Sequence, residues 1–497
     1  MHDAATERYC LAVPNEWASP SFEVDGAIAI PRPAFVRTVT FYDTVDLALA
    51  RSKAFLARSD DGWLLHVEPL VTKARLVRIH SPHRAKSSVD LVPDEIQRAV
   101  TARTLGADLR PVAAADELVR PIDIVTLDGH LLATVLDTTT TVARGDGGAT
   151  PLRHVTVTTT ADTPPDLPRE LLHAIEAHEG TRSSPAAMVV QLLGRRATLP
   201  GLVPIVPLDE HSDARAAIRA ALSGHVRRLI AHDARLRTVT DQVAVHQSRV
   251  ATRRLRADLK TFRSLLDRDW AEELTDRIHP LADALGAVRD LDVLIERLES
   301  SRDALPKSDH DGANGVIDLA RYERDLAATA LRAALDEPDH VTLLAELASA
   351  ATTPFTTADA TRPAADVLPH LARKRWKQLR TAVHSLDDDA TDEALHAVRI
   401  DAKQCRYAAQ AAARVIGPDA KRFAHAIAAV QQVLGDHHDA VTTEAWIRAH
   451  AAHLSGADQF AAGALATIQA QLARASREAF PAVWAEASGS ELRTWWK

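Results

Sequence analysis

Two segments of this sequence place basic side chains three and four residues apart, each behind a histidine. The members are His246, Arg249, Arg253, Arg256, Lys260 and Arg263 in the first segment, and His396, Arg399, Lys403 and Arg406 in the second. At about 100° per residue, these positions form one narrow basic stripe along each predicted helix. Arginine offers paired donors to phosphate oxygens, lysine a point charge, and a protonated histidine adds more. Each stripe therefore predicts a site for a long polyanion.

A basic stripe on a helix needs compensation, because like charges three and four residues apart repel each other. Acidic residues are sparse within the two segments, where Asp258 and Asp401 stand. For a single helix, a solvated basic face or pairing with acids of a neighbouring helix would be the simpler interpretation. The presence of the same stripe twice favours a ligand.

The two stripes belong to an internal duplication. His246 and His396 lie 150 residues apart, and Arg253 and Lys403 share the same offset. Farther on, LGAVRDLD at 285–292 resembles LGDHHDAV at 434–441, so that Asp290 corresponds to Asp439. A duplicated helical segment predicts two pseudo-symmetric copies whose stripes face each other across one groove.

Other chemistry is less well supported by these residues. Neither leading histidine is followed by a second histidine or a carboxylate three or four residues later, and His437 and His438 point about 100° apart, so we predict no metal site here. Aromatic residues make up only 4% of the chain and do not alternate with the basic positions. Nucleic acid is therefore an unlikely partner.

The elements that must position these residues differ between the two parts of the chain. From residue 213 onward alanine, leucine and arginine dominate at helical spacing, which predicts an all-α domain of roughly eight helices with loops at 305–315 and 352–363. Before about residue 160, strands are predicted at 36–42, 63–67, 131–136 and 155–160, with one helix at 94–103 between them and another at 168–179 after them. Asp-Gly pairs at 61–62 and 128–129 indicate hairpins, so this part is predicted to be a mainly antiparallel β-barrel or sheet. We place the domains at 1–198 and 212–497, joined by a Pro-rich linker at 199–211.

Bulk composition limits the function classes. The 497 residues carry a net charge of −8, so any polyanion site must be a local concentration of cations. Two cysteines, Cys10 and Cys405, indicate no disulfide framework and fit a reducing compartment. The sequence contains no secretory signal and no apolar run of about 18 residues, so we expect a cytoplasmic protein without a membrane partner. The oligomeric state stays open.

The segments VHQSRVATRRLR and LHAVRIDAKQCRY closely resemble the motif of CHAD domains. This resemblance covers about residues 212–490. It implies two four-helix bundles, related by a pseudo-two-fold axis, lining a basic pore or groove that holds inorganic polyphosphate, with association with polyphosphate granules as a further expectation. Carried over by position, the two stripes are the contacts. Further basic walls are expected from Arg227, Arg228 and Arg235, and from Arg373, Lys374 and Lys377. Gln404 stands where the first copy has Arg254, which predicts an asymmetric groove.

The first part resembles a CYTH domain, the family of triphosphate tunnel enzymes. FYDTVDLALARS at 41–52, DDGWLLHVE at 60–68, LVPDEI at 91–96, LRPV at 109–112 and LDGHLLATVLD at 127–137 follow the order of that family. The resemblance implies an antiparallel barrel whose bore holds a triphosphate, with glutamates binding Mg²⁺ or Mn²⁺.

The catalytic residues of that family are mostly missing here. At its opening Glu-x-Glu-x-Lys motif this chain has Glu7, Tyr9 and Leu11, His66 replaces a lysine, and the late acidic strand reads His154 to Thr158. Isolated charges survive, and we interpret most of them as surface or rim residues. They are Glu7, Arg58, Arg120, Asp137 and Arg153. We predict no catalytic residues and no cofactor; an active barrel would use Mg²⁺ or Mn²⁺.

Three functions remain open from the sequence. The first is binding of polyphosphate without catalysis. The second is a metal-dependent triphosphatase or polyphosphatase whose helical domain presents the substrate. The third is a helical scaffold for other polyanions.

Overall fold

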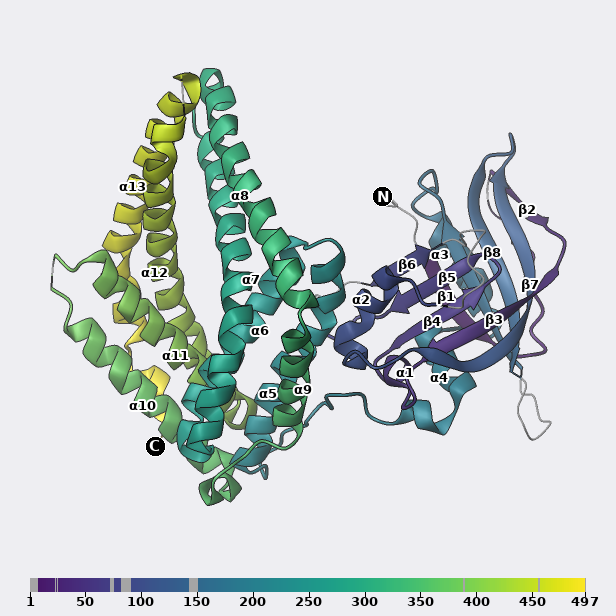
Figure 1. Cartoon of the computed structure of the whole chain (residues 1–497), viewed down its shortest axis with the longest axis horizontal. Coiled ribbons are helices and arrows are strands. Elements are labelled where there is room, and N and C mark those ends of the chain that lie inside the picture. Colours follow the sequence, from purple (N-terminus) through teal and green to yellow (C-terminus); the bar gives the residue numbers. More distant parts are fainter. Residues whose placement is uncertain are drawn as a thin grey trace. The chain divides into compact units, whose positions relative to one another are not determined.

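The computed structural model describes residues 8–22, 24, 26–71, 76–81, 91–142, 151–387, 389–454 and 456–496; Glu7 lies outside them. The chain divides into two compact units, Met1–Leu202 and Val203–Lys497. The first is a curled antiparallel sheet with short helices, and the second is helical (Figure 1). The predicted fold class is confirmed for both units.

The sheet has ten strands in the order β10-β1-β9-β8-β7-β3-β4-β5-β6, with β2 paired to β7. The strands are β1 Arg8–Val13, β2 Ala27–Pro31, β3 Phe35–Asp43, β4 Ala54–Ser59, β5 Gly62–Val67, β6 Val77–Ser81, β7 Arg110–Thr126, β8 Leu131–Val142, β9 Leu152–Thr159 and β10 Thr181–Arg182. Asp128-Gly129 forms the predicted turn between β7 and β8, and Gly129 has a φ of 92°, which favours glycine. β8 continues past the predicted end at residue 136, because Thr138 to Val142 keep pairing with β7.

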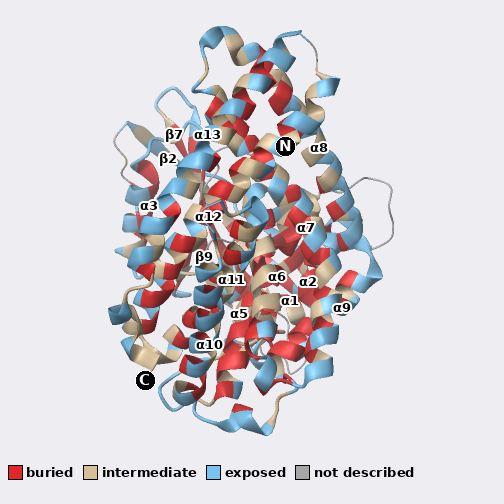
Figure 2. Ribbon diagram, turned by 90° about the vertical axis from the view of Figure 1, so that its left-hand side faces the viewer, coloured by how far each residue is buried: buried red, intermediate tan, exposed pale blue. Residues whose placement is uncertain are grey.

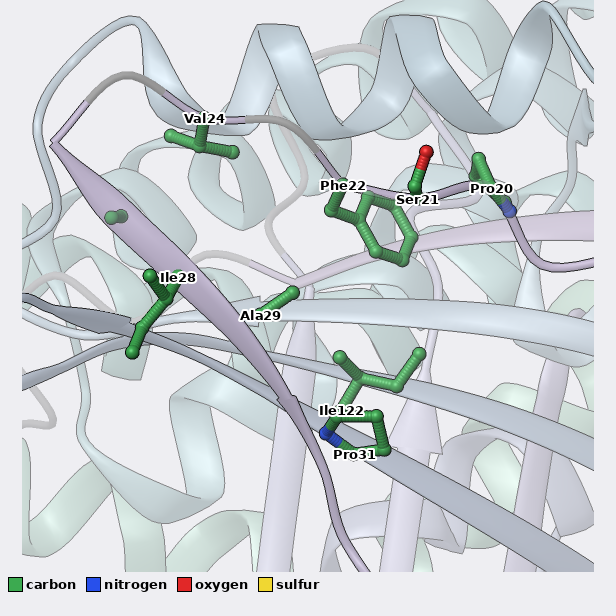
Figure 3. A pocket seen from close by; sticks show the side chains of 9 residues that line it. Pro20, Ser21, Phe22, Val24, Ile28, Ala29, Pro31 and Ile122 are labelled. Carbon is green, nitrogen blue, oxygen red and sulfur yellow. The ribbon is translucent and has the colours of Figure 1, made fainter.

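The two faces of the sheet carry different residues because side chains alternate along each strand. On β1, Leu11 is fully buried in a core that includes Ile175 of α3 (Leu167–Glu176). Cys10 points to the opposite, concave face, where its Sγ lies 3.7 Å from Sδ of Met188 on α4 (Pro185–Leu193). A separate apolar pocket of about 790 Å³ lies beside β2 and is lined by Phe22 and Ile122 among others (Figure 3).

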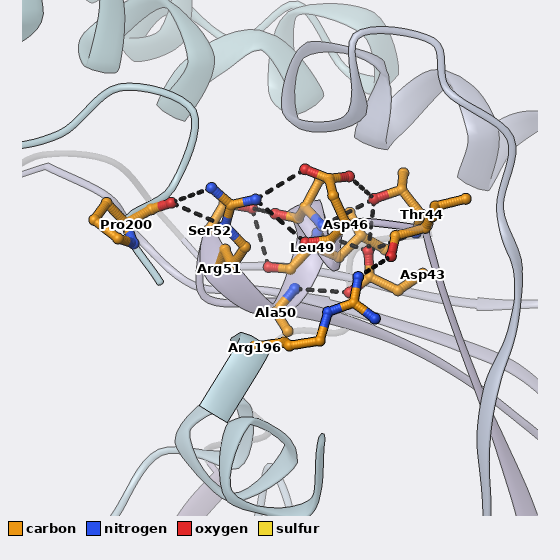
Figure 4. Close-up of polar contacts among 11 residues, drawn as sticks. Asp43, Thr44, Asp46, Leu49, Ala50, Arg51, Ser52, Arg196 and Pro200 are labelled. Atoms are coloured by element: carbon orange, nitrogen blue, oxygen red, sulfur yellow. Dashed lines mark hydrogen bonds and ion pairs between the residues drawn. The ribbon is translucent and has the colours of Figure 1, made fainter. Parts of the chain in front are cut away.

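The end of β3 is fixed by a buried carboxylate. Asp43 accepts hydrogen bonds from the amides of Thr44 (2.7 Å), Leu49 (2.9 Å) and Ala50 (2.9 Å), which holds the short helix α1 (Ala48–Arg51) in place (Figure 4). Arg51 donates through Nε to the carbonyl of Pro200 at 2.9 Å. Residues up to Pro200 therefore pack with the first unit. The remaining helix before β7 is α2 (Asp94–Thr104).

Nine α-helices lie in the described part of the second unit, one more than the sequence predicted. They are α5 Ala214–Thr238, α6 Gln242–Thr261, α7 Arg268–Arg302, α8 His310–Asp336, α9 Pro338–Thr352, α10 Ala364–His384, α11 Asp392–Ile416, α12 Pro418–His450 and α13 Gly456–Ala487. None of the described helices combines the length and the hydropathy that a bilayer span requires.

The loop predicted at 305–315 is too long, since α8 already begins at His310. The glycines that suggested a loop serve close packing instead. A methyl group on Gly312 would clash with the backbone carbonyl of Ala457 in α13, and one on Gly315 would clash with the carboxylate of Asp458. The glycines therefore allow α8 and α13 to approach closely.

The duplication appears directly in the arrangement of the helices. α5, α6 and α7 begin at residues 214, 242 and 268, and α10, α11 and α12 begin 150 residues later, at 364, 392 and 418. Ahead of α5 and α10 the chain forms a reciprocal pair of hydrogen bonds: Ala214 N–H donates to the carbonyl of Arg362, and Ala364 N–H to that of Ser212, both at 2.9 Å. Adding 150 to the donor Ala214 gives the other donor, Ala364, and subtracting 150 from the acceptor Arg362 gives the other acceptor, Ser212. The two bonds are therefore related as two contacts are related by a two-fold axis.

Two kinds of core hold the helical unit together. The second copy has its own core, which joins α10, α11 and α12 through Leu379, Val398 and Phe423. A distal core joins the copies, because Leu298 of α7 and Ile317 of α8 pack with Leu465 of α13. Buried residues gather along α5, α6 and α7 (Figure 2).

Candidate functional site

The two basic stripes are positioned by apolar faces beside them. On α6, Leu255 and Leu259 are buried, and Asp241 caps the helix by accepting from the amide of Ala244 at 2.7 Å. On α11, Val398 and Cys405 are buried. Since α6 packs against α11 and both apolar faces point into cores, the adjacent basic faces are fixed at the junction of the copies.

Four cations meet at this junction, and we call them the central cluster: Arg249 and Arg253 from α6, and Arg399 and Lys403 from α11. Burial, followed by the charges of Arg399 and Arg253, lowers the pKa of Lys403 from 10.5 to about 7. Burial also lowers the pKa of Arg399, and Arg253 contributes again. These shifts mean that cations from both copies lie close together without full neutralisation.

The two copies support their leading arginines in the same way. Nη2 of Arg249 lies 3.4 Å from the carboxylate of Asp290 on α7, and Nη2 of Arg399 lies 3.6 Å from that of Asp439 on α12. The sequence repeat matched these two aspartates to each other. The long distances and the exposure of Asp290, whose side chain is 73% exposed, make both ion pairs weak.

Each of these arginines also lies across a glycine of the following helix. Arg249 rests against Gly286 so closely that a methyl group there would overlap its guanidinium. In the second copy, a methyl group on Gly435 would stand 3.6 Å from Nε of Arg399, an ordinary contact. The shared Arg–Gly–Asp arrangement shows that the duplication extends to side-chain packing.

A groove of about 710 Å³ continues from the central cluster along α6. It contains the cationic side chains of Arg253, Arg256, Lys260, Arg263 and Lys403, together with Tyr407 and the acidic Glu272 and Asp276. Arg263 forms an ion pair with Glu272, so the far end of the groove is partly neutralised. The Nε atoms of Arg253 and Arg256 in the groove, and those of Arg399 and Arg406 outside its lining, are buried, and none has a hydrogen-bond partner among the described residues. Unpaired donors of this kind are suited to an anionic ligand.

The histidine of the second stripe, His396, does not add the positive charge that the sequence suggested. His396 Nδ1 lies 3.0 Å from Nδ1 of His438 on α12. Burial, and then the charge of Arg399, lowers the pKa of His438 to about 4, and burial lowers that of His396 as well. Both rings are therefore neutral at neutral pH. His246 in the first copy is exposed.

The additional basic walls expected from α5 and α10 lie mostly apart from the groove. Arg227 donates to the carbonyl of Val203 at 2.9 Å, and Arg235 pairs with Asp241, the cap of α6. Arg373, Lys374 and Lys377 are exposed on α10 and do not line the groove. Arg375 is the α10 cation that reaches α6, where it donates to the carbonyl of Lys260 at 2.7 Å.

Three arginines of the helical unit lie in a second pocket rather than in the groove. Arg228 of α5, expected in a basic wall, joins Arg254 of α6 and Arg414 of α11 there. Sequence reasoning missed the last two because they lie off the stripes and because Arg254 has no cationic counterpart at Gln404. Their clustering depends on three helices that the sequence alone could not orient.

In the first unit, the concave face of the sheet encloses a bore of about 410 Å³ lined by Arg8, Arg37, Arg58, Arg78 and His80, by Glu117, and by apolar residues that include Phe55 and Leu136. Arg37 pairs with Glu117 at 2.8 Å. The residues of β1 that face this bore are Arg8 and Cys10. Tyr9 and Leu11 pack on the opposite core, so our placement of the family's opening motif on Glu7, Tyr9 and Leu11 follows the wrong face of the strand.

The survivors Asp137 and Arg153 are not rim residues, contrary to our interpretation. Asp137 is 2% exposed and accepts two hydrogen bonds from Arg153 at 2.8 and 2.7 Å, and Arg120 lies 3.6 Å from the same carboxylate. This carboxylate is therefore neutralised by two guanidinium groups. Within the described residues, no group of three or more potential metal ligands is brought together.

Comparison with known proteins gives three kinds of similarity. A CHAD domain family model matches residues 220–448, which confirms the predicted resemblance of the helical unit. Two Mycobacterium tuberculosis proteins, uncharacterized protein Rv2226 of strain H37Rv and uncharacterized protein MT2285 of strain CDC 1551, are each 30% identical over 501 residues, covering 93% of this chain and 92% of theirs.

Two solved structures are also similar to part of the chain. PptA from Streptomyces chartreusis is 23% identical, with a TM-score of 0.46, over 55% of this chain and 100% of its own. The crystal structure of the CHAD domain from the plant Ricinus communis is 26% identical, with a TM-score of 0.43, over 56% of this chain and 96% of its own.

Proposed function

We propose that this chain, which belongs to the CHAD domain family, binds inorganic polyphosphate along the basic groove between α6 and α11. The observation that carries the proposal is the central cluster, in which Arg253 and Lys403 occupy equivalent positions of the two copies, and in which burial and the charges of Arg399 and Arg253 lower the pKa of Lys403. Like charges held together raise the free energy of the empty protein. A polyanion relieves this repulsion, whereas a neutral ligand does not.

The form of the groove supports a long, flexible anion. The stripe on α6 runs from Arg249 to Lys260, a length of about 16 Å at ~1.5 Å per residue. Its donors are guanidinium groups with unpaired Nε atoms, which suit the closely spaced oxygens of a phosphate chain. The groove offers Tyr407 as its one aromatic lining residue in the described part of the chain, so it supplies little stacking surface for nucleic-acid bases.

Binding without catalysis is the form of this proposal that the first unit supports. In the bore, Glu117 is paired with Arg37, and outside it Asp137 is paired with two arginines. A hard divalent cation needs free carboxylate oxygens to bind beside substrate phosphates. We further propose that polyphosphate binding brings the protein to cytoplasmic polyphosphate granules, where such chains are concentrated.

The test compares long polyphosphate, tripolyphosphate and double-stranded DNA as ligands of the full chain at two salt concentrations. We expect tight binding of long polyphosphate that weakens steeply with salt, by about 0.7–0.9 in log–log slope for each neutralised phosphate if nucleic acids are a guide. A flat salt response would contradict an electrostatic groove. Equal affinity for DNA would favour the alternative of a general polyanion scaffold.

A further inference from the structure

We propose that the pocket between α5, α6 and α11 is a separate binding site for a single phosphate group, either orthophosphate or the terminal phosphate of a polyphosphate chain. The pocket has a volume of about 280 Å³, less than half that of the groove. It is lined by Ala217, Ala221, His225 and Arg228 of α5, Arg254 and Asp258 of α6, and Tyr407, Gln410, Ala411 and Arg414 of α11. The inference that the terminal phosphate of a polyphosphate chain binds here rests on the proposed function.

The charges in this pocket are unbalanced. Three guanidinium groups face one carboxylate, Asp258, which is already engaged by Nε2 of His225 at 3.0 Å. Arg228 and Arg414 make no hydrogen bond or ion pair with any described residue, and after burial the charge of Arg414 further lowers the pKa of Arg228. Two unpaired arginines that repel each other across a small pocket are a favourable site for an oxyanion.

The third arginine is held in a fixed orientation. The guanidinium of Arg254 lies 3.8 Å from the centre of the Tyr407 ring and also donates to Gln410. Burial lowers the pKa of Arg254 to about 10, although the charge of Asp258 acts in the opposite direction. A guanidinium stacked on an aromatic ring presents its N–H edge in one plane, ready for paired hydrogen bonds to a phosphate.

Several buried polar atoms around this pocket have no hydrogen-bond partner among the described residues, which also favours a bound anion. Nε of Arg228, Nδ1 of His225 and the hydroxyl of Tyr407 are buried, and none has a hydrogen-bond partner among the described residues. Buried polar atoms are nearly always paired in folded proteins, so three of them around one small pocket indicate a polar occupant. A tetrahedral phosphate offers acceptors to Arg228 of α5, Arg254 of α6 and Tyr407 of α11. Nδ1 of His225, whose Nε2 faces the carboxylate of Asp258, is an acceptor and suits the proton of a monohydrogen phosphate.

The pocket breaks the internal duplication that the groove follows. At the offset of 150 residues, Arg228, Arg254 and Arg414 correspond to Gln378, Gln404 and Ser264. The pocket therefore exists once, although the stripes exist twice. Tyr407 lines both the pocket and the groove, so the two cavities lie on either side of one residue. A single site at the edge of a symmetric groove is suited to the end of a polyphosphate chain, because a linear chain has far fewer terminal phosphates than internal ones.

The test measures binding of orthophosphate to the full chain and to three variants by calorimetry. We expect one phosphate per chain, and a loss of affinity of about tenfold or more in Arg228→Gln and Arg414→Gln. Arg253→Ala with Lys403→Ala, which alters the groove, should leave orthophosphate affinity unchanged. Absence of orthophosphate binding to the unaltered protein, or equal loss in the groove variant, would overturn the proposal. Circular dichroism and thermal unfolding confirm that each variant is folded.

A second arm separates the two phosphate sources. If chain ends occupy the pocket, Arg414→Gln weakens binding of short polyphosphate with free ends but not of the same chains with both ends blocked by amidation. If both kinds of chain bind the variant as they bind the unaltered protein while orthophosphate binding is lost, free phosphate is the ligand. Failure of long polyphosphate to bind the unaltered protein would refute the proposed function. In that event, the orthophosphate measurements would still show whether the pocket binds phosphate.

Discussion

Arg249 on α6 lies directly against Gly286 on α7, and its Nη1 also donates to the carbonyl of Ala282 at 2.9 Å. The guanidinium fills the space that any larger side chain at position 286 would need. Its counterpart Arg399 sits less tightly beside Gly435. The two copies thus place an arginine against a glycine in the same way, but Arg249 is held more tightly than Arg399.

This difference predicts opposite outcomes for two similar substitutions. Gly286→Ala should push Arg249 away from its present position and weaken polyphosphate binding, while Gly435→Ala should leave binding unchanged. Both should raise helix stability by up to about 1 kcal/mol, since alanine favours helix over glycine. Thermal unfolding and polyphosphate titration measure the two effects. Equal binding by both variants would show that the position of Arg249 does not matter.

The central cluster predicts the largest loss of binding. Arg253→Ala with Lys403→Ala removes one cation from each copy, and each lost charge-assisted contact should cost about 1.5–3 kcal/mol, so we expect polyphosphate affinity to fall on the order of a hundredfold or more. The matched control is Arg373→Ala with Lys374→Ala, which removes the same net charge from the exposed face of α10. A similar loss of polyphosphate affinity in the control would show that the net charge of the protein matters and the position of the central cluster does not.

Polyphosphate binding should depend on pH through Lys403. In the free protein its pKa is about 7, whereas a bound polyanion favours the protonated amine. Binding therefore takes up a proton above pH 7, and affinity should fall as the pH rises from 7 to 9, by at most about tenfold per pH unit for one proton. Lys403→Arg should remove this dependence. Calorimetry in buffers of different ionisation enthalpy counts the protons, and an identical slope in the variant would assign them elsewhere.

The same lysine affects the stability of the free protein with the opposite trend. Because its folded pKa lies below the value of 10.5 for an exposed lysine, the unfolded chain holds more protons between about pH 7 and 10.5. Its contribution to the free energy of unfolding therefore rises with pH across that window and is most unfavourable below pH 7. Comparing thermal unfolding of Lys403→Met and the unaltered protein across this range checks the sign.

The first unit should not hydrolyse triphosphates at a useful rate. With Mg²⁺ or Mn²⁺ and tripolyphosphate, thiamine triphosphate or ATP, we expect no metal-dependent phosphate release, because the carboxylates of Glu117 and Asp137 are held by arginines. Release that requires metal and disappears in Glu7→Gln or Glu117→Gln would establish the triphosphatase alternative.

The helical unit should fold and bind polyphosphate alone. A fragment of residues 203–497 keeps Val203, which is 3% exposed and whose carbonyl accepts from Arg227. We expect the affinity of the full chain and a helical circular dichroism spectrum. A fragment beginning at residue 208 should bind equally but be about 1–2 kcal/mol less stable, since it loses that buried side chain. Loss of binding in both fragments would show that the first unit contributes to the site.

The sequence predicted the all-α second unit and four of the ten described strands, because these rest on local periodicity. Leu255 and Leu259 on α6 are buried on the face where helical spacing places them, and the alignment of residues 285–292 with 434–441 matched Asp290 to Asp439. Both predictions need only the geometry of one helix and the comparison of two segments.

What the sequence could not predict depends on contacts between distant elements. Arg254 and Arg414 meet Arg228 only because α5, α6 and α11 enclose one pocket. The neutral state of His396 follows from burial and from His438 on another helix. In the first unit, the bore-facing side of β1 could not be chosen from the motif, since a shift of one residue exchanges the two faces of a strand.

The reciprocal hydrogen bonds of Ala214 and Ala364 are those that two identical subunits would form across the axis of an isologous dimer. In this chain the two subunits are covalently fused, so the assembly cannot dissociate on dilution and the groove exists at any protein concentration. Fusion also frees each half to change alone. A true homodimer would place an arginine, or a glutamine, at both position 254 and position 404, whereas this chain has one of each, and with them a single pocket beside a two-fold groove.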